Sequence, residues 1–144
     1  MMQKLFLAAF LFFASFSGMA QIAPVTLTSE TLKDGQDGMP PKAKVFIEYS
    51  GKKVFIETTN APSVSGGTEK ENLGKNMLDK GLAWWAGAGN DYFLFYKGGK
   101  LQVYRRLVQE EGGNFPKKLV KTITLNQLTK KPAELKKAIE AFLK

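Results

Sequence analysis

The chain contains no cysteine and no histidine among its 144 residues. Without thiol and imidazole groups, the commonest zinc sites, serine–histidine triads, thiol nucleophiles and haem ligation by those two residue types are excluded. Disulfide bonds are excluded as well, so a folded domain must be stabilised by its hydrophobic core alone. Catalysis by carboxylates, catalysis by a serine–lysine pair, and binding without catalysis remain open. We therefore expect no metal site and no cofactor.

Long hydrophobic runs are confined to the N-terminus, where Lys4 precedes an apolar stretch over residues 5–16. Small residues follow and end at Ala20, as cleavage by a signal peptidase requires. A membrane-spanning helix would need about 20 apolar residues, and this stretch is shorter. The pattern predicts a signal peptide over residues 1–20 and an exported domain over residues 21–144, periplasmic or secreted, without a transmembrane segment. An uncleaved anchor is the alternative.

Positive charge is in excess and is concentrated toward the C-terminus. The chain has 21 Lys and Arg against 13 Asp and Glu, and loss of Lys4 with a signal peptide leaves a net charge of +7. Residues 21–90 are balanced, whereas residues 91–144 hold twelve basic and five acidic residues. Such a field attracts polyanions and anionic lipid headgroups. A solvated, solubilising surface is the alternative interpretation.

The pentapeptide Lys-Val-Phe-Ile-Glu occurs twice, at residues 44–48 and 53–57. Its β-branched and aromatic content is typical of strands, and the four intervening residues suit a turn. Folding the second copy back on the first gives the pairs Lys44–Glu57, Val45–Ile56, Phe46–Phe55, Ile47–Val54 and Glu48–Lys53. We expect the aliphatic side chains to face the core and the phenylalanines to face a covering element or a contact surface. An exposed edge could also pair with another chain.

A second hairpin is predicted over residues 91–110, where Gly98 and Gly99 separate two aromatic and aliphatic runs. Its predicted pairs are Asp91–Arg106, Phe93–Tyr104, Leu94–Val103 and Tyr96–Leu101. Residues 117–125 return as a third strand. One face is expected to carry Leu94, Tyr96, Leu101, Val103, Leu107 and Val120, and the other Phe93, Phe95, Tyr104, Val108, Leu119 and Ile123. Because both faces are apolar, each needs a cover.

Two helices complete the expected order β-β-β-α-β-β-β-α, in which residues 21–31 form the first strand. Residues 68–71 fit a capping box that opens a helix ending at Gly81, and Pro132 opens a basic amphipathic helix at the C-terminus. The sequence predicts a single α+β domain with antiparallel sheet of about six strands and a C-terminal amphipathic helix. A small β-barrel capped by that helix is the alternative.

The tryptophan pair is the strongest candidate for a binding site. Trp84 and Trp85 are adjacent, so they would point to opposite sides of a strand, and small residues follow them. With Tyr92 they could form an aromatic platform for a sugar, a lipid or a partner protein. Arg105 and Arg106 would supply anion contacts from the paired strand. Burial of one or both tryptophans in the core is the alternative.

No catalytic constellation is found in the sequence. Ser50 and Lys53 match the S-x-x-K pattern of penicillin-recognising enzymes, but they span an expected turn and no companion motif is present. Glu48 and Glu57 could belong to a glycosidase pair, but each lies opposite a lysine in the expected hairpin. The glycine-rich residues 87–89 lead into a strand, which a dinucleotide-binding loop does not do.

By elimination, the sequence predicts a small non-enzymatic binding module of the cell envelope or the secreted fraction, which binds a protein partner as an inhibitor or accessory subunit. One alternative is a protein that uses the basic C-terminal third to bind a polyanion or membrane surface, with an anionic glycan or lipid as partner. A second is a hydrolase that uses carboxylates alone. Alternating basic and aromatic residues also suit single-stranded nucleic acid, but export disfavours that partner.

Overall fold

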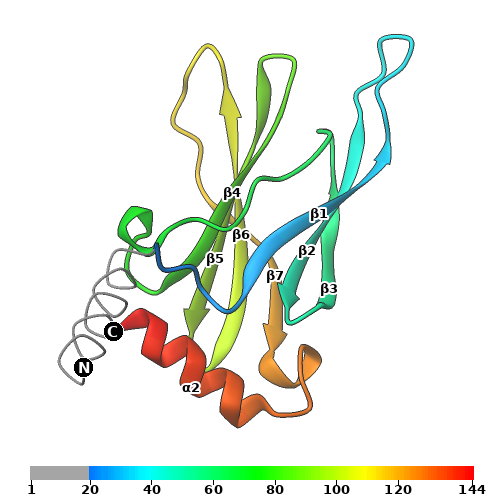
Figure 1. Cartoon of the computed structure of the whole chain (residues 1–144). Coiled ribbons are helices and arrows are strands. Elements are labelled where there is room, and N and C mark those ends of the chain that lie inside the picture. Colours follow the sequence, from blue (N-terminus) through cyan, green and yellow to red (C-terminus); the bar gives the residue numbers. More distant parts are fainter. Residues whose placement is uncertain (1–19) are drawn as a thin grey trace, which may run out of the picture.

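The computed structural model describes residues 20–144, so the expected signal peptide lies outside the described residues except for Ala20. Seven strands of this part form two antiparallel sheets that face each other (Figure 1). The first sheet consists of β1 (Thr26–Lys33), β2 (Lys42–Tyr49) and β3 (Lys52–Thr59), in that order. The second consists, in order, of β4 (Met77–Trp85), β5 (Ala88–Lys97), β6 (Lys100–Gln109) and β7 (Lys118–Thr124).

One α-helix, α2 (Pro132–Leu143), and two 3-10 turns, η1 (Lys70–Asn72) and η2 (Leu125–Gln127), complete the described fold. The expected combination of antiparallel sheet with a C-terminal amphipathic helix is confirmed. The expected strand count and the barrel alternative are wrong, because seven strands divide into two separate open sheets. Within residues 20–144, no helix has the length and apolar character that crossing a membrane requires.

Three hairpins, β2–β3, β4–β5 and β5–β6, turn through two residues each, and all of these residues have positive φ. Gly98 and Gly99 between β5 and β6 have φ of 57° and 76°. Turns of this kind match the twist of the flanking strands and thereby set the register. The predicted register of β5 and β6 is confirmed, with Asp91 opposite Arg106 and Leu94 opposite Val103.

The repeated pentapeptide forms parts of β2 and β3, and its predicted register holds next to the turn. Three pairs lie opposite each other as expected: Phe46–Phe55, Ile47–Val54 and Glu48–Lys53. A β-bulge beyond Phe46 then places Val45 opposite Glu57 and Lys44 opposite Thr58. The expected pairs Val45–Ile56 and Lys44–Glu57 are therefore wrong. A bulge inserts one unpaired residue into a strand. The charge pattern of the repeated pentapeptide did not indicate that this residue was present.

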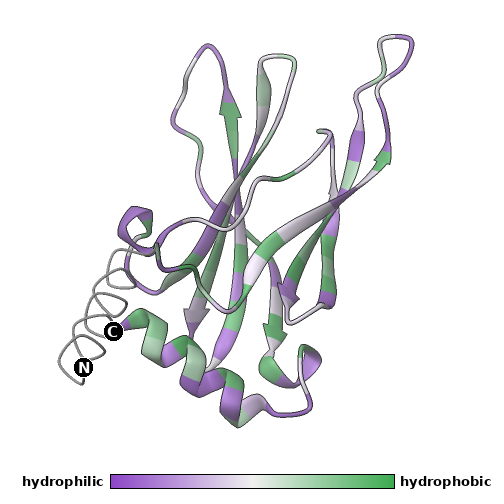
Figure 2. Cartoon of the chain, in the orientation of Figure 1, coloured by the Kyte–Doolittle hydropathy of each residue, from purple (hydrophilic) through white to green (hydrophobic). Residues whose placement is uncertain are grey.

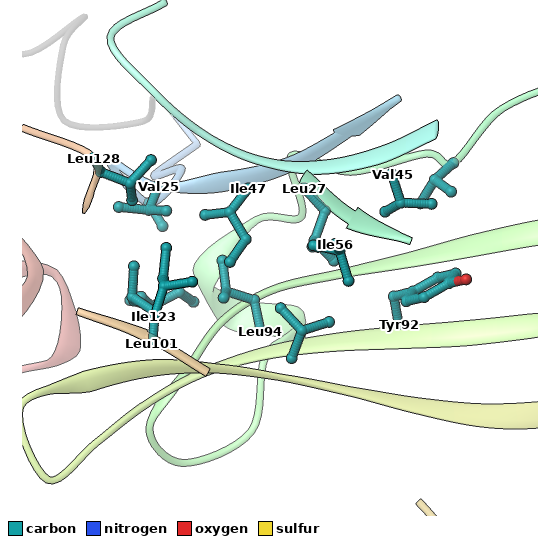
Figure 3. Packing of buried hydrophobic residues seen from close by; sticks show 14 of the residues in the cluster. Val25, Leu27, Val45, Ile47, Ile56, Tyr92, Leu94, Leu101, Ile123 and Leu128 are labelled. Carbon is teal, nitrogen blue, oxygen red and sulfur yellow. The ribbon is translucent and has the colours of Figure 1, made fainter. Parts of the chain in front are cut away.

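The main core fills the space between the two sheets (Figure 3). The first sheet and the segment before it contribute fully buried aliphatic side chains, among them Val25, Leu27, Val45 and Ile47. These residues face Tyr92, Leu94, Leu101 and Ile123 of the second sheet. The expected core face of the β2–β3 hairpin is thus confirmed. Burying one such aliphatic side chain stabilises the fold by roughly 1.5–3 kcal/mol.

Ile123 lies on the inner face, so the expectation that it shares a face with Phe93 and Phe95 is wrong. It is buried in the main core opposite Leu101. A register shift between Val103 and Tyr104 leaves one additional residue, Val120, in β7, so the alternation changes along that strand. Because β7 is apolar on both sides of this shift, its hydrophobic pattern did not reveal the bulge.

Helix α2 closes one end of the sandwich (Figure 1). Leu135, Ile139 and Phe142 recur on one side of the helix and are buried in the main core. Leu125 and Leu128, in and after η2, complete this end. Hydrophobic and hydrophilic residues alternate along the strands of both sheets (Figure 2). The amphipathic C-terminal helix therefore serves as an end cap between two sheets.

The expected helix over residues 68–81 is wrong, because this segment forms η1, a loop and most of β4. Asp79, in β4, is fully buried. Its carboxylate accepts four backbone N–H bonds: from Leu27 at 2.7 Å and Gly67 at 3.0 Å to Oδ2, and from Thr68 and Lys80 at 2.9 Å each to Oδ1. Such donors compensate the burial of a carboxylate. A helical Asp79 could not collect N–H groups from β1 and the preceding loop.

The connection between β3 and β4 covers one edge of each sheet, because it passes between β1 and β4 (Figure 1). The N–H of Val64 donates to Ser29 Oγ of β1 at 2.8 Å, and Ser65 forms an isolated bridge with Leu82 of β4. A Cβ at Gly66 would lie 2.0 Å from the carbonyl oxygen of Leu27, so only glycine permits this approach. Covered edges are unavailable for pairing with other chains.

The outer face of the second sheet carries a smaller apolar cluster, formed by Met77, Phe93 and Phe95 with Leu73 and Tyr104 beside them. The amine of Lys117 lies 4.3 Å from the ring centre of Phe93, and that of Lys97 lies 4.6 Å from the ring centre of Phe95. Such cation–π contacts contribute about 0.5–1 kcal/mol each at exposed sites. The cover expected on this face is thus provided by lysine side chains and by the loop after η1.

The outer face of the first sheet is open at the repeated phenylalanines. The rings of Phe46 and Phe55 meet edge to face at 6.0 Å, and Phe55 remains 45% exposed. β3 is an edge strand, so the second copy of the pentapeptide carries the edge hazard predicted for it. Lysines at its start, Lys52 and Lys53, and the bulge at its centre are features that discourage pairing with another chain.

Replacing Asp79 with asparagine should strongly destabilise the fold. The amide NH2 would face backbone donors and leave N–H groups unsatisfied in the interior, at about 1–3 kcal/mol per group. We expect the free energy of unfolding, measured by urea denaturation, to fall by about 3–5 kcal/mol. Asp37→Asn in the exposed β1–β2 loop is the matched control and should change it by less than about 0.5 kcal/mol. Equally small effects would contradict the role assigned to Asp79.

Candidate functional site

The end of the sandwich opposite α2 is open, and the β1–β2, β4–β5 and β6–β7 loops extend beyond the sheets there (Figure 1). Two neighbouring pockets of about 350 and 390 Å³ lie at this end. The first is lined by Asn90, Arg105, Leu107, Phe115, Pro116 and Lys118. The second is lined by Pro40, Asn60, Trp85, Ala86, Ala88, Gly89, Asn90 and Leu107. We call the residues that line these two pockets the open end.

The rim of the open end is apolar. Trp85 is 42% exposed and Leu107 39% exposed. Leu32 and Met39, at the end of β1 and in the β1–β2 loop, are also exposed at this end of the molecule. Single exposed hydrophobic residues are common, whereas several at one end of a small domain indicate a contact surface.

A polar layer separates this rim from the main core. Tyr92 Oη donates to Glu57 Oε1 at 2.7 Å, and Arg105 Nη1 donates to both oxygens of Glu57 at 2.9 and 2.7 Å. Glu57 belongs to the first sheet and its two partners to the second, so the bonds join the sheets. Tyr92 stands at one end of the row of core side chains, with its hydroxyl directed away from them (Figure 3). Hydrogen bonds to charged groups contribute about 1.5–3 kcal/mol each.

The bulge in β3 brings Glu57 into this layer. In an unbroken strand Glu57 would share the outward face with Phe55. The inserted residue reverses the alternation, so that Glu57 and the buried Thr59 both face the second sheet. The expectation that Glu57 pairs with Lys44 concealed this role. The register predicted for β5 and β6 implies that Arg105 lies opposite Tyr92, as it does. An arginine that is partly buried between two sheets needs an acidic partner. This need was the one signal in the sequence that pointed to an acidic residue such as Glu57.

The hydroxyl of Tyr92 is held in its neutral form. Burial raises the pKa of Tyr92 well above its usual value, and its hydrogen bond to the Glu57 carboxylate contributes in the same direction. The phenol therefore remains a hydrogen-bond donor to Glu57 throughout the ordinary pH range.

The five residues proposed as a binding site divide between two faces of the second sheet. Trp85 and Arg105 line the open end, on the inner side. Trp84, adjacent to the buried Ala83, lies on the outer side and is 40% exposed. Arg106 also lies on the outer side. Tyr92 is fully buried, so it cannot belong to an exposed aromatic platform, and it acts instead through its hydroxyl.

Arg106 lines a pocket of about 300 Å³ on the outer face. Its Nη2 donates to Asp91 Oδ2 at 2.9 Å, and its guanidinium carbon lies 5.1 Å from the ring centre of Phe93. Lys80 lines the same pocket. The two arginines are thus adjacent on β6, but they line different pockets on opposite faces of the sheet.

The described residues offer no metal centre, because no three of their Asp and Glu side chains lie close enough to share an ion. The acidic groups nearest to the candidate arginines, Glu57 and Asp91, are each bound by one of them. The geometry thus supplies fixed cations and apolar walls. No protein-family model matches the sequence, and searches of curated proteins and of solved structures find no significant match.

Replacing Tyr92 with phenylalanine should make stability less sensitive to alkaline pH. An unfolded tyrosine titrates near pH 10, whereas burial raises the pKa of Tyr92 in the folded protein. Its contribution is therefore fully present below about pH 10 and is lost as the pH rises further. Between about pH 9 and 11, the free energy of unfolding should fall more steeply in the wild type than in Tyr92→Phe. Urea denaturation across this range measures the difference, and parallel slopes would refute it.

Proposed function

We propose that the protein is an exported, non-catalytic binding module whose open end takes up an apolar segment of a protein partner. The observation that carries this proposal is an exposed tryptophan, Trp85, beside a pocket that residues before β2, after β3 and in the second sheet line together. Tryptophan is enriched among the few residues that supply most of the binding energy in protein interfaces. A partner of this kind suits both an inhibitor and an accessory subunit.

The open end combines apolar walls with a few fixed polar groups. Trp85, Leu107 and Phe115 line it together with Asn90 and Arg105. Binding pockets commonly have this composition, since the walls supply affinity and the polar groups fix orientation. Arg105 is held by Glu57 before any partner arrives, which lowers the entropic cost of binding.

The backbone presents Trp85 rigidly. It is the last residue of β4, and the two-residue turn at Ala86 and Gly87 joins it directly to β5. An indole on a tight hairpin loses less conformational freedom on binding than one on a long loop. The position therefore suits an anchor residue.

The carboxylates support binding over hydrolysis. Hydrolysis of a glycoside by carboxylates alone needs two such groups about 5–9.5 Å apart on either side of the substrate. Within residues 20–144, neither pocket of the open end is lined by Asp or Glu. Glu57 lies next to Arg105, but Arg105 and Tyr92 already occupy its oxygens.

Site-specific photo-crosslinking in cells that produce the protein tests the proposal. A photoreactive phenylalanine analogue at Leu107 or Phe115 lies in the open end, whereas the same analogue at Phe55 lies on the outer face of the first sheet. We expect both open-end positions to crosslink one common protein and Phe55 not to crosslink it. Equal labelling from all three positions, or no protein crosslinked from the open end, would count against the proposal.

With the crosslinked partner purified, Trp85→Ala should weaken binding about 30-fold or more, as is typical of an anchor residue. Trp84→Ala is the matched control, because it removes an equally exposed indole from the opposite face of the same strand. It should change the affinity less than about threefold. Calorimetric titration measures both affinities, and urea midpoints verify folding. Similar losses in the two variants would remove Trp85 from its assigned role.

A further inference from the structure

The outer face of the second sheet holds a cationic pocket that the open end does not use. This pocket has a volume of about 300 Å³, and Ser65, Lys80, Leu82, Asp91 and Arg106 are among the residues that line it. Lys80 and Arg106 flank it from β4 and β6, on either side of β5. The two cations outnumber the one carboxylate, that of Asp91, and cationic N–H groups are donors suited to a phosphate group.

Arg106 is oriented before any ligand binds. One nitrogen of its guanidinium, Nη2, bonds Asp91, and the group lies over the ring of Phe93. A guanidinium has five N–H donors, so this arrangement fixes the group and leaves further donors for an anion. Its charge is partly compensated by Asp91, whereas Lys80 forms no ion pair within the described residues.

Two further lysines extend the positive surface along the same face. Lys117 lies over the rings of Phe93 and Phe95, and Lys97 lies over Phe95 and Tyr104. Among residues 20–144, neither amine has a carboxylate within ion-pair distance. The aromatic rings therefore hold uncompensated charge in fixed positions on the sheet surface.

Exposed apolar side chains flank these cations at both edges of the sheet. Leu82 and Trp84 on β4 are 42% and 40% exposed, and Leu119 on β7 is 51% exposed. Leu119 lies opposite Tyr104, which belongs to the outer cluster, so it shares this face. Tryptophan and leucine beside cations are typical of surfaces that enter the interfacial region of a membrane.

We propose that the outer face of the second sheet binds an anionic phospholipid surface. A lipid phosphate would occupy the pocket between Lys80 and Arg106, Lys97 and Lys117 would contact neighbouring headgroups, and Trp84, Leu82 and Leu119 would enter the interface. The central rings, Phe93 and Phe95, are at most 9% exposed, so they offer a sugar no stacking surface. Free phosphate alone would leave the apolar edges of the face uncovered.

This inference is independent of the proposed function. Trp84 and Arg106 lie on one face of the second sheet, and Trp85 and Arg105 lie on the other. Failure of lipid binding would thus leave the open end unaffected. A protein partner at the open end would in turn leave the outer face accessible.

Binding of the full domain to vesicles tests the proposal. Vesicles with about 30% phosphatidylglycerol in phosphatidylcholine should bind the protein, pure phosphatidylcholine should not, and moderate salt should weaken binding. Each lysine near an anionic surface strengthens binding about fivefold. Lys97→Gln with Lys117→Gln should therefore weaken it about 25-fold. Lys44→Gln with Lys52→Gln makes the same charge change on the first sheet and should have less than about a threefold effect. Equal losses would overturn the proposal.

Tryptophan fluorescence identifies the face that meets the vesicle. Trp85→Phe leaves Trp84 as the sole indole of the domain, and Trp84→Phe leaves Trp85. Emission should shift to shorter wavelength on anionic vesicles in Trp85→Phe and remain unchanged in Trp84→Phe. A shift confined to Trp85 would overturn the proposal. So would stronger binding to a sulfated oligosaccharide or to inorganic phosphate than to the vesicles, because either result identifies an anion site without a lipid.

Discussion

The buried carboxylate of Asp79 holds the two sheets in their relative position. Its four N–H donors come from β1, from the connection between β3 and β4, and from β4 itself. Edge strands of the two sheets, together with the segment that covers both, therefore converge on one side chain. Burying a charge is costly unless donors replace the lost water, and here backbone N–H groups do so without any cation. The long connection is fixed by these bonds, and with it the separation of the sheets.

A second constraint acts along the length of the sandwich. From α2 toward the open end, side chains between the sheets change from aliphatic residues such as Leu101 and Ile123 to Tyr92, and then to the ion pair of Glu57 and Arg105. The bulge in β3 is the backbone change that brings Glu57 into this sequence of layers. Glu57 thereby becomes the acidic partner of Arg105, whose side chain is partly buried between the sheets. Without such a partner, the loss of water around the guanidinium would destabilise the fold. The helix-capped end is thus packed with apolar side chains, whereas the opposite end carries an ion pair between the sheets.

Local rules predicted the hairpin turns and the C-terminal helix, whereas long-range contacts determine the features that were predicted wrongly. The two turn glycines and the β-branched content of the flanking residues were sufficient to predict the register of β5 and β6. The reason is that a tight hairpin is determined by residues that are close in sequence. The helix expected over residues 68–81 had a valid capping pattern, but the donors that draw Asp79 into a strand include Leu27, 52 residues away. The bulges were not predicted for a related reason, because each one depends on packing against the opposite sheet. In β3, the bulge turns both Ile56 and Glu57 toward that sheet. Of the candidate site, the opposite orientation of Trp84 and Trp85 followed from strand alternation, but the partners that other strands and loops supply, such as Glu57 beside Arg105, could not be predicted.

Adjacent pairs of like residues explain why one sheet offers two distinct surfaces. Successive side chains on a strand point to opposite faces, so a doublet away from a bulge supplies one member to each face. Trp84 with Trp85 and Arg105 with Arg106 are such doublets on β4 and β6. On the inner face, Glu57 neutralises the arginine and the indole borders a pocket between the sheets. On the outer face, Asp91 compensates Arg106, but Lys80, Lys97 and Lys117 add charge beyond it. The same two residue types therefore border an apolar mouth on one side and a cationic apolar surface on the other, and the difference comes from the lysines that the outer face adds.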